Sequence, residues 1–305
     1  MKLTVATCQF GVCDDIEANA KRIRRQMHAA KQRGAQVVHF GEAALSGYAG
    51  VDFRSFRGFD WQTLRTCSED IAALAAELGV WVLLGSAHPL GARTKPHNCM
   101  YVIDDQGTLV DRYDKMFCAG NRAGTKGDLA HYSPGEHYCV FEIRGVRCGV
   151  LICHDYRYPE LYREYKRRGV ELMFHAYHTG NNPPDRLAMM RAQVGEAHHG
   201  LNRGTTLPEI TMPATMHAAA ASSHVWISCS NSSAPYSCWP AFMMRADGVM
   251  VGRLRRHQPG VLVTTVDTRA RLYDSTRDWR DRAMRGIHHS GTLVRSARSR
   301  NREAF

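Results

Sequence analysis

Short apolar runs alternate with amphipathic segments along the whole chain, and this alternation constrains the fold more than any other sequence feature. The run at residues 37–40 follows Gly34, which ends a segment whose apolar residues recur at helical spacing, and it stops just before Glu42. Neither an internal repeat nor a low-complexity linker interrupts the pattern. Strands interleaved with helices over the full length are typical of one α/β domain.

The pattern predicts both helix–strand units and hairpins. Helices are predicted after Asp14, whose spacing from Glu17 fits a capping box, and at 71–78 (preceded by Ser68), 160–168, 186–197 and 216–222. Strands are predicted at 3–9, 37–40, 80–84, 98–103, 108–112, 138–143, 147–152, 172–175, 225–229 and 261–267, with a hairpin at 242–255.

Two packed mixed sheets with helices outside each would bury every one of these apolar runs. We therefore expect an α/β fold, a four-layer α-β-β-α sandwich, although the pattern alone leaves other α/β folds open. Residues 1–280 should form this single domain, followed by a basic C-terminal tail at 281–305.

Composition argues against several classes of protein. Hydrophobic residues make up 44% of the chain, enough for a substantial core. The apolar runs are short and have charges nearby, so we expect no transmembrane helix and no membrane partner. The N-terminus runs directly into a strand pattern without a secretory-signal pattern, so we expect a cytoplasmic location. The ten cysteines are scattered without a Cys-x-x-Cys pair, and we expect no disulfide scaffold, no metal and no cofactor.

The formal charge of +11 leaves a non-catalytic, nucleic-acid-binding protein open as an alternative. Arginine is densest near the end of the chain, but no recognisable nucleic-acid module accompanies it. A solvated basic tail or an oligomer contact explains this charge more simply, so we expect no nucleic-acid partner.

Three chemically useful side chains stand at predicted strand ends. Glu42 follows a buried strand, Lys115 follows a hairpin strand, and Cys153 stands where a strand turns into a helix. Active-site residues tend to lie at such ends, where the backbone amides of the turn are free. Singly, a glutamate or lysine there is more typical of a surface, and a cysteine of a core.

A cysteine that attacks an amide needs a base, a positive group for the developing oxyanion and a proton for the leaving amine. The three residues can meet these needs together, with the lysine favouring the thiolate and the glutamate moving the proton. The residues alone also leave open a Cys/His hydrolase in which His154 or His175 replaces Glu42.

The three segments resemble the nitrilase superfamily, also called carbon–nitrogen hydrolases, in order, spacing and neighbours. Members have a Glu before a Leu-Ser-Gly-Tyr-like run, a Lys near His or Phe positions, and a Cys followed by Asp, Arg, Pro and Glu. The corresponding positions here are Glu42, Lys115, Cys153, Asp155, Arg157, Pro159 and Glu160. The resemblance extends over nearly the whole chain through the opening Ala6-Thr7-Cys8-Gln9, Ser133-Pro134-Gly135 and Asn231.

The resemblance implies that Cys153 is the nucleophile and Glu42 the general base. It also implies that Lys115 and the backbone amide of His154 stabilise the tetrahedral intermediate, and that a thioester acyl-enzyme forms and is cleaved by water.

Two positions depart from the family pattern. Many members carry a further glutamate six residues before the Pro-Gly motif, where this chain has Asp128, one methylene shorter. Asp128 is therefore a fourth catalytic candidate, with Glu136 as the nearby alternative. Gly41 stands where a proline usually precedes the glutamate.

Substrate recognition is predicted from the neighbours of these segments. Asp155 favours an amidase or carbamoylase, since nitrilases often have glutamate two positions after the nucleophile. Arg157 has a structural alternative, pairing with Glu160 or Asp155. The candidate substrate-binding residues are Tyr48, His154, Arg157, His175 and Tyr177, and His178 is expected on the same pocket wall.

The resemblance implies that the segment 179–213 is longer than the corresponding connection in typical relatives, and we expect either a lid or rim over the pocket or a subunit contact.

The combined prediction is a metal-independent cysteine amidase that hydrolyses a small amide or N-carbamoyl compound, releases ammonia or an amine, and forms a homodimer or larger homo-oligomer. Nitrile hydrolysis by the same three residues is the nearest alternative.

Overall fold

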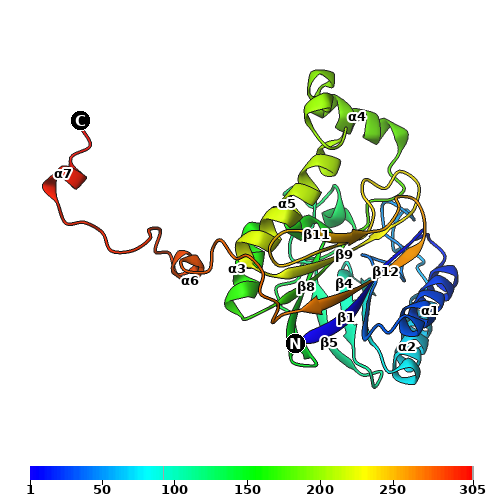
Figure 1. The fold of residues 1–305 in the computed structure, drawn as a ribbon. Helices are drawn as coiled ribbons and strands as arrows, with labels where there is room; N and C mark the ends of the chain where they lie inside the picture. The colour runs from blue at the N-terminus through cyan, green and yellow to red at the C-terminus, as the bar shows by residue number, and fades with distance from the viewer. Residues whose placement is uncertain (92, 304–305) are drawn as a thin grey trace.

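The computed structural model describes residues 1–91 and 93–303. Figure 1 shows its elements in chain order. The strands are β1 (Lys2–Phe10), β2 (Val37–His39), β3 (Trp81–His88), β4 (His97–Ile103), β5 (Leu109–Asp114), β6 (Val140–Ile143), β7 (Val146–Ile152), β8 (Leu172–Ala176), β9 (Trp226–Ser232), β10 (Phe242–Met244), β11 (Met250–Arg253) and β12 (Gly260–Asp267). The α-helices are α1 (Ile16–Gln32), α2 (Trp61–Leu78), α3 (Pro159–Arg167), α4 (Pro184–Val194), α5 (Leu207–Ser223), α6 (Arg280–Met284) and α7 (Ala297–Arg300). Three 3₁₀ helices are η1 (Asp128–Ala130), η2 (Cys153–Arg157) and η3 (Glu196–Leu201).

The strands form one large mixed sheet with the order β5-β4-β3-β2-β1-β9-β8-β7-β6. β1, β2 and β3 run parallel, as do β7, β8 and β9, whereas β3–β4, β4–β5 and β6–β7 pair antiparallel. The two halves join where Gln9 and Phe10 of β1 pair with Asn231 and Ser232 of β9. The predicted mixed α/β fold is therefore confirmed, with the two expected sheets connected at one point, and the exact four-layer description stays a prediction.

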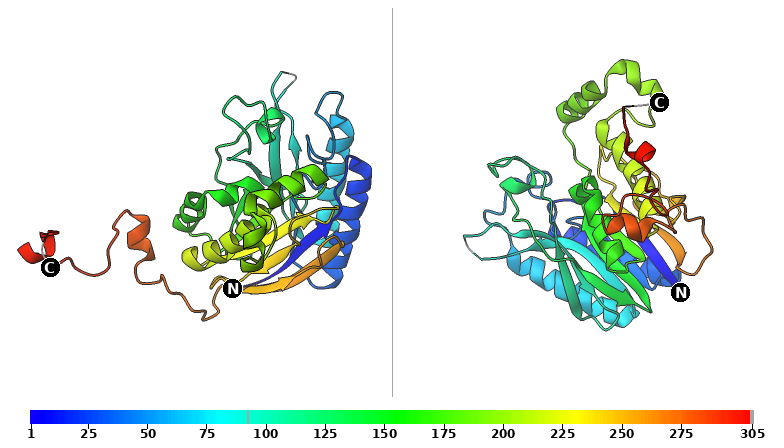
Figure 2. Two further views of the ribbon diagram at one scale, coloured as in Figure 1. Left: turned by 90° about the horizontal axis from the view of Figure 1, so that it is seen from above. Right: turned by 90° about the vertical axis from the view of Figure 1, so that its left-hand side faces the viewer.

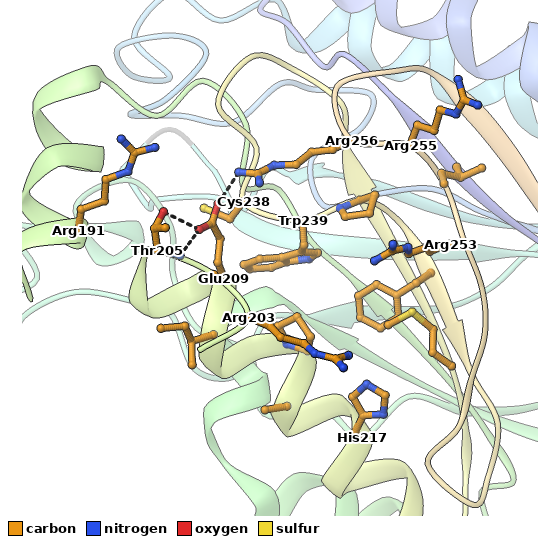
Figure 3. A pocket seen from close by; sticks show the side chains of 18 residues that line it. Arg191, Arg203, Thr205, Glu209, His217, Cys238, Trp239, Arg253, Arg255 and Arg256 are labelled. Carbon is orange, nitrogen blue, oxygen red and sulfur yellow. Dashed lines mark hydrogen bonds and ion pairs between the residues drawn. The ribbon is translucent and has the colours of Figure 1, made fainter. Parts of the chain in front are cut away.

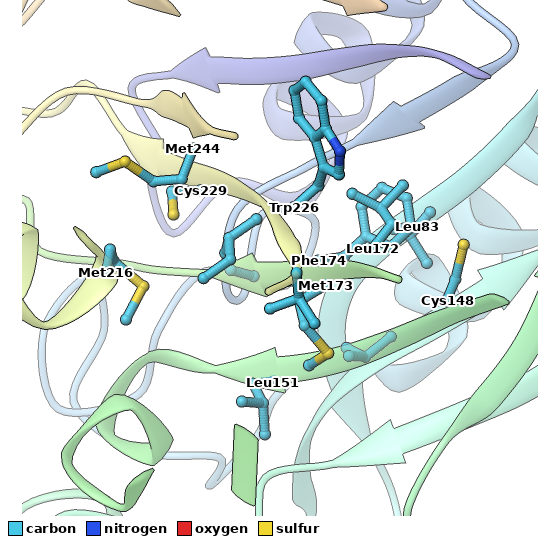
Figure 4. Packing of buried hydrophobic residues seen from close by; sticks show 14 of the residues in the cluster. Leu83, Cys148, Leu151, Leu172, Met173, Phe174, Met216, Trp226, Cys229 and Met244 are labelled. Atoms are coloured by element: carbon cyan, nitrogen blue, oxygen red, sulfur yellow. The ribbon is translucent and has the colours of Figure 1, made fainter. Parts of the chain in front are cut away.

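Burial on both faces of the strands accounts for the apolar runs in the sequence. Along β1, Leu3 and Val5 face one buried cluster, and Ala6 and Cys8 face another, as the two-residue period of a strand requires. The first cluster holds side chains from both halves of the sheet, and Figure 4 shows Leu83 of β3 together with residues of β7, β8 and β9. The second cluster lies under α1 and α2. Both sheet halves thus contribute to one interior.

Helices cover the sheet on two sides, with α1 and α2 on one and α3 and α5 on the other (Figure 1). All four begin at other residues than predicted, α3 by a single residue, at Pro159. Asp15, not Asp14, caps α1, and Asp60 caps α2 at Trp61, ten residues before the predicted start. The apolar stripe of α2 already begins at Leu64, so the cap at Asp60 sets the start of the helix.

The helix predicted at 216–222 starts nine residues earlier in the structure. The helix begins at Leu207 and includes Pro213 in its second turn. Thr206 caps it and forms a reciprocal capping box with Glu209, which holds the first turn in place.

Two segments stand away from the body. The arm formed by α4 and η3 (residues 184–201) has no buried residue in either helix, and the C-terminal segment leads outward through α6 and α7 (Figures 1 and 2). Asp274 anchors the start of this segment through Arg280 at 2.8 Å. The division into a domain at 1–280 and a tail at 281–305 stays a prediction, and residues 304–305 lie outside the described part. No helix within the described residues is long and apolar enough to cross a membrane.

Candidate active site

Lys115 and Cys153 line one cavity of about 490 Å³, and the buried carboxylate of Glu42 contacts Lys115 behind it. Glu42 follows β2, Lys115 follows β5, and Cys153 is the first residue of η2 directly after β7. The Glu42 and Lys115 side chains are 0% and 1% exposed, and Lys115 Nζ lies 2.7 Å from Glu42 Oε1. The three predicted catalytic residues therefore meet although long stretches of sequence separate them.

Three donors fix the carboxylate of Glu42. Lys115 Nζ and Asn98 Nδ2 both donate to Oε1 at 2.7 Å, while the backbone N–H of His178 donates to Oε2 at 3.0 Å. A carboxylate held in this way has no freedom to rotate, and the raised pKa of the Cys153 thiol includes a contribution from it, which suits a proton acceptor for the thiol.

Asp128 provides the second carboxylate at Lys115. Its Oδ2 lies 2.6 Å from Lys115 Nζ and accepts the backbone N–H of Ala119 at 2.9 Å, and its Oδ1 accepts the Tyr48 hydroxyl. Burial alone would raise the pKa of Asp128, but the Lys115 charge and these hydrogen bonds hold it below its usual value. Glu136, the alternative carboxylate, is exposed.

The ammonium of Lys115 is thus held between two carboxylates. Burial alone would lower its pKa, but Asp128 and Glu42 raise it well above the usual value. Lys115 therefore stays positively charged at neutral pH, as a group that stabilises a developing oxyanion must.

Cys153 is half-buried and has a positive φ of 42°, an uncommon conformation for a residue with a side chain. Burial first, and then the charge and hydrogen bond of Glu42, raise the pKa of its thiol well above the usual value, although Lys115 opposes the rise. The resting group is therefore a thiol. The Lys115 charge favours the thiolate, as the sequence predicted, but burial and Glu42 outweigh this effect on the pKa of the thiol.

Three of the predicted substrate-binding residues, Tyr48, His154 and Arg157, line the cavity, and so does His178. Burial lowers the pKa of His154 to about 4, with the Lys115 and Arg157 charges adding to the effect. His154 is therefore neutral at pH 7.

His175 and Tyr177, the other two predicted substrate-binding residues, are absent from the cavity lining and lie fully buried behind it. His175 Nε2 lies 3.2 Å from the carbonyl oxygen of Cys153, and its other ring nitrogen contacts the Tyr162 hydroxyl of α3. Tyr177 stacks on His175 with ring centroids 4.4 Å apart. Their positions support the backbone of the cysteine turn and do not reach into the pocket.

Asp155 ties the strand end that carries the cysteine to the one that carries the lysine. It accepts the backbone N–H groups of Ile152 and Phe117, at 2.9 and 2.8 Å, and the Tyr113 hydroxyl at 2.8 Å. Burial raises its pKa to about 6, and these hydrogen bonds oppose the rise. Within the described residues, Arg157 forms no ion pair with Asp155 or Glu160, and its guanidinium lies over the Tyr156 ring at 4.9 Å.

Sequence reasoning missed two polar partners of the site. Asn98 was assigned only as the start of a strand, yet its side chain holds Glu42. Asp52 pairs with His178 at 2.9 Å between two nearly fully buried side chains. Asn98 is a polar residue at the start of an apolar strand, and this could have indicated a role for its side chain. Asp52 lies in a loop whose path cannot be predicted from the periodicity of apolar residues.

The long segment 179–213 contributes to the rim of the cavity. Arg186 and Met190 of α4, one helical turn apart, line it together with Pro208 of α5. The segment is therefore placed where a lid or rim would be, and its effect on selectivity stays a prediction.

A larger cavity of about 870 Å³ adjoins the candidate site and shares Cys238 and Trp239 with it. Its lining includes five arginines, among them Arg203, Arg253 and Arg256 around Trp239 (Figure 3). It lacks the carboxylate, lysine and cysteine combination, so the chemistry belongs to the smaller cavity. Within the described residues, no group of three or more His, Cys, Asp or Glu side chains could hold a metal ion.

Comparison with known proteins was made on sequence and on structure. The family profile described as carbon–nitrogen hydrolase matches residues 4–274. An N-carbamoylputrescine amidase of Solanum tuberosum is 27% identical over 187 residues, which cover 60% of this chain and 61% of that protein. An omega-amidase of Xenopus tropicalis is 26% identical over 198 residues, 63% of this chain and 70% of that protein. A deaminated glutathione amidase of Yersinia enterocolitica is 31% identical over 176 residues, 55% and 60% of the two chains. The chain spans about three fifths of the length of the first of these relatives.

Solved structures of a nitrilase-superfamily amidase from Nesterenkonia sp. share the fold. One has a TM-score of 0.69 at 18% identity and covers 93% of this chain and 96% of that chain. Another, of a variant with the same TM-score, identity and coverage, shows covalent addition of the acetamide moiety of fluoroacetamide at its active-site cysteine.

Proposed function

The chain belongs to the carbon–nitrogen hydrolase family of the nitrilase superfamily, and we propose that it hydrolyses a small amide or N-carbamoyl compound through Cys153, Glu42 and Lys115. The observation that carries this proposal is the Lys115 ammonium held between Glu42 and Asp128, at 2.7 and 2.6 Å, in the cavity that Cys153 lines. The two carboxylates and the ammonium are almost fully buried, so water screens their interactions little.

The first half of the proposed reaction forms a thioester. Because the thiol rests protonated, Glu42 takes the proton as Cys153 Sγ attacks the carbonyl carbon. Negative charge develops on the carbonyl oxygen, where the Lys115 ammonium and the backbone N–H of His154 stabilise it. The carbon–nitrogen bond then breaks, Glu42 returns the proton to the nitrogen, and ammonia or an amine leaves.

The second half cleaves the thioester with water. Glu42 accepts a proton from the water as its oxygen attacks the carbonyl carbon, and the same two donors stabilise the second tetrahedral intermediate. The carbon–sulfur bond breaks and the proton returns to Cys153. The net reaction consumes one amide and one water and yields one acid and one amine, with no oxidant or reductant.

Amides are preferred over nitriles because the three relatives compared above are named amidases. The names of those proteins support hydrolysis of an amide carbon–nitrogen bond. Nitrile hydrolysis by the same three residues is the alternative, and the assay of ammonia release distinguishes the two.

Ammonia release from amides, N-carbamoyl amino acids, carbamoyl amines and nitriles tests the proposal. Wild type should release ammonia from at least one amide or carbamoyl compound, and Cys153→Ala should lose activity by on the order of 10⁴-fold or more while remaining folded. Cys13→Ala removes another half-buried thiol away from the cavity and serves as the matched control. Full activity in folded Cys153→Ala would refute the mechanism, and release from nitriles alone would replace amidase with nitrilase.

A further inference from the structure

The larger cavity beside the catalytic one is strongly basic. It has a volume of about 870 Å³, and five arginines from three separate stretches of the chain line it. They are Arg191 of α4, Arg203 in the loop before α5, Arg253 at the end of β11, and Arg255 and Arg256 just after that strand. Glu209 of α5 is the only carboxylate of the lining within the described residues. Five arginines against one carboxylate leave four positive charges uncompensated.

Glu209 is already engaged through both of its oxygens. Its Oε1 accepts Arg256 Nη2 at 2.5 Å, and its Oε2 accepts the backbone N–H groups of Thr205 and Thr206 at 2.9 and 3.2 Å. Burial would raise the pKa of Glu209, but the hydrogen bonds from Thr205 and Arg256 hold it below the usual value. The other four arginines form no ion pair within residues 1–91 and 93–303, so no anion of the protein neutralises them.

Trp239 lies on the wall between this cavity and the catalytic one. It is 5% exposed, and its Nε1–H group has no hydrogen-bond acceptor in the described part of the chain. Figure 3 shows Arg203 and Arg253 near Trp239 in the middle of the cavity, whereas Arg191 and Arg255 lie at its edges. A buried donor without an acceptor costs free energy, and a ligand that supplied an acceptor would remove this cost.

The remaining lining is largely apolar. Ile210 and Pro213 of α5, Phe242 of β10 and Met250 of β11 contribute to it. All five arginines are exposed, whereas Phe242 is buried. A ligand that fits this cavity therefore combines an anionic group with an uncharged part that packs on apolar side chains.

The excess of positive charge favours a phosphate group over a carboxylate. A single guanidinium can bind both oxygens of a carboxylate through paired N–H donors. A phosphate monoester carries a charge of about −1.5 to −2 at pH 7 and has three acceptor oxygens, so it can bind two guanidinium groups at once.

We propose that the larger cavity binds a phosphorylated small molecule, whose phosphate group is held by Arg203 and Arg253 while its uncharged part packs against Trp239 and the apolar lining. This site lies apart from Cys153 and does not depend on the proposed hydrolysis. Its ligand would lie next to the catalytic cavity, because Cys238 and Trp239 line both cavities.

Calorimetric titrations of the full chain at constant ionic strength test the proposal with phenyl phosphate, benzoate and inorganic phosphate. Phenyl phosphate should bind with one equivalent and with a Kd about tenfold or more below that of benzoate, which has the same ring but a carboxylate. Its Kd should also lie about tenfold below that of inorganic phosphate, which lacks the apolar part. Arg203→Gln and Arg253→Gln should each weaken phenyl phosphate about tenfold.

Arg298→Gln is the matched control, because it removes the same charge from α7, outside the cavity. Its Kd for phenyl phosphate should stay within about twofold of wild type. Trp239→Phe keeps an aromatic ring but lacks the N–H donor, so it should weaken binding about three- to tenfold. It should also abolish the change in tryptophan fluorescence that phenyl phosphate causes in wild type.

No saturable binding of phenyl phosphate, or an equal Kd for benzoate, would overturn the proposal. So would wild-type affinity in both folded Arg203→Gln and folded Arg253→Gln, or an equal loss in Arg298→Gln, since binding would then reflect the overall charge of the chain.

Discussion

Replacing Asp128 with asparagine tests whether this carboxylate, one methylene shorter than the glutamate of many relatives, orients Lys115. The substitution keeps the shape of the side chain and removes the charge that lies 2.6 Å from Lys115 Nζ. Both side chains are at most 5% exposed, so solvent does not replace the lost interaction. A hydrogen bond between charged groups contributes about 1.5–3 kcal/mol, which corresponds to roughly a 10- to 150-fold loss in kcat.

The assay is steady-state ammonia release over a range of pH. Because burial lowers the pKa of Lys115 and Asp128 is the first of the groups that raise it, Asp128→Asn should also move the alkaline limb of the kcat profile to lower pH. KM should change less than kcat, and Asp128→Glu should recover part of the activity.

Glu136→Gln is the control, because Glu136 is the alternative carboxylate of the same loop and is exposed. We expect its activity to stay within about twofold of wild type. Wild-type kcat in folded Asp128→Asn, or an equal loss in Glu136→Gln, would refute the role given to Asp128.

Three further changes test the ion pair beside Glu42, the arm and the tail. Burial alone would lower the pKa of His178, but the Asp52 carboxylate raises it above the usual histidine value of about 6.5. The ion pair therefore stabilises the fold fully below about pH 6.5, and this stabilisation is lost as the pH rises through the raised pKa of His178. In urea titrations, wild-type unfolding free energy should therefore fall more steeply above pH 6.5 than that of Asp52→Asn, and parallel curves would contradict this. Deleting 184–204, with a short glycine linker, should broaden selectivity among acyl groups because arm side chains line the cavity, and unchanged kcat/KM ratios would count against a lid or rim. Deleting 286–305 should lower the mass seen by light scattering because the tail exposes large apolar side chains, and a monodisperse wild-type monomer would remove the predicted homo-oligomer.

The meeting of Glu42, Lys115 and Cys153 could be anticipated because each follows a strand that the sequence pattern indicates. Glu42 and Cys153 each follow a run of buried residues that contains β2 or β7. Lys115 follows a hairpin whose turn the sequence shows clearly. The local sequence pattern thus predicts that each of the three side chains lies at the end of a strand. The family resemblance then indicated that the three ends face one another.

Other parts depended on contacts that no local pattern encodes. The loop between β5 and β6 has little regular structure, so only its folded course decides that Asp128 and not Glu136 reaches Lys115. His175 lies near the end of β8 and Tyr177 directly follows that strand. Whether these side chains face the pocket or α3 depends on packing, such as the contact of His175 with Tyr162. Arg186 lies on a helix without buried residues, so no apolar stripe indicates which face meets the cavity.

Intact-protein mass spectrometry of rapidly quenched reactions tests the role of Cys153 most directly. With an amide that is turned over, a fraction of the protein should gain the mass of the amide less ammonia, and peptide mapping should place this acyl group on Cys153. The adduct should disappear in Cys153→Ala. Turnover at the wild-type rate without any acyl adduct, or an adduct that maps to another cysteine and persists in Cys153→Ala, would contradict the thioester mechanism.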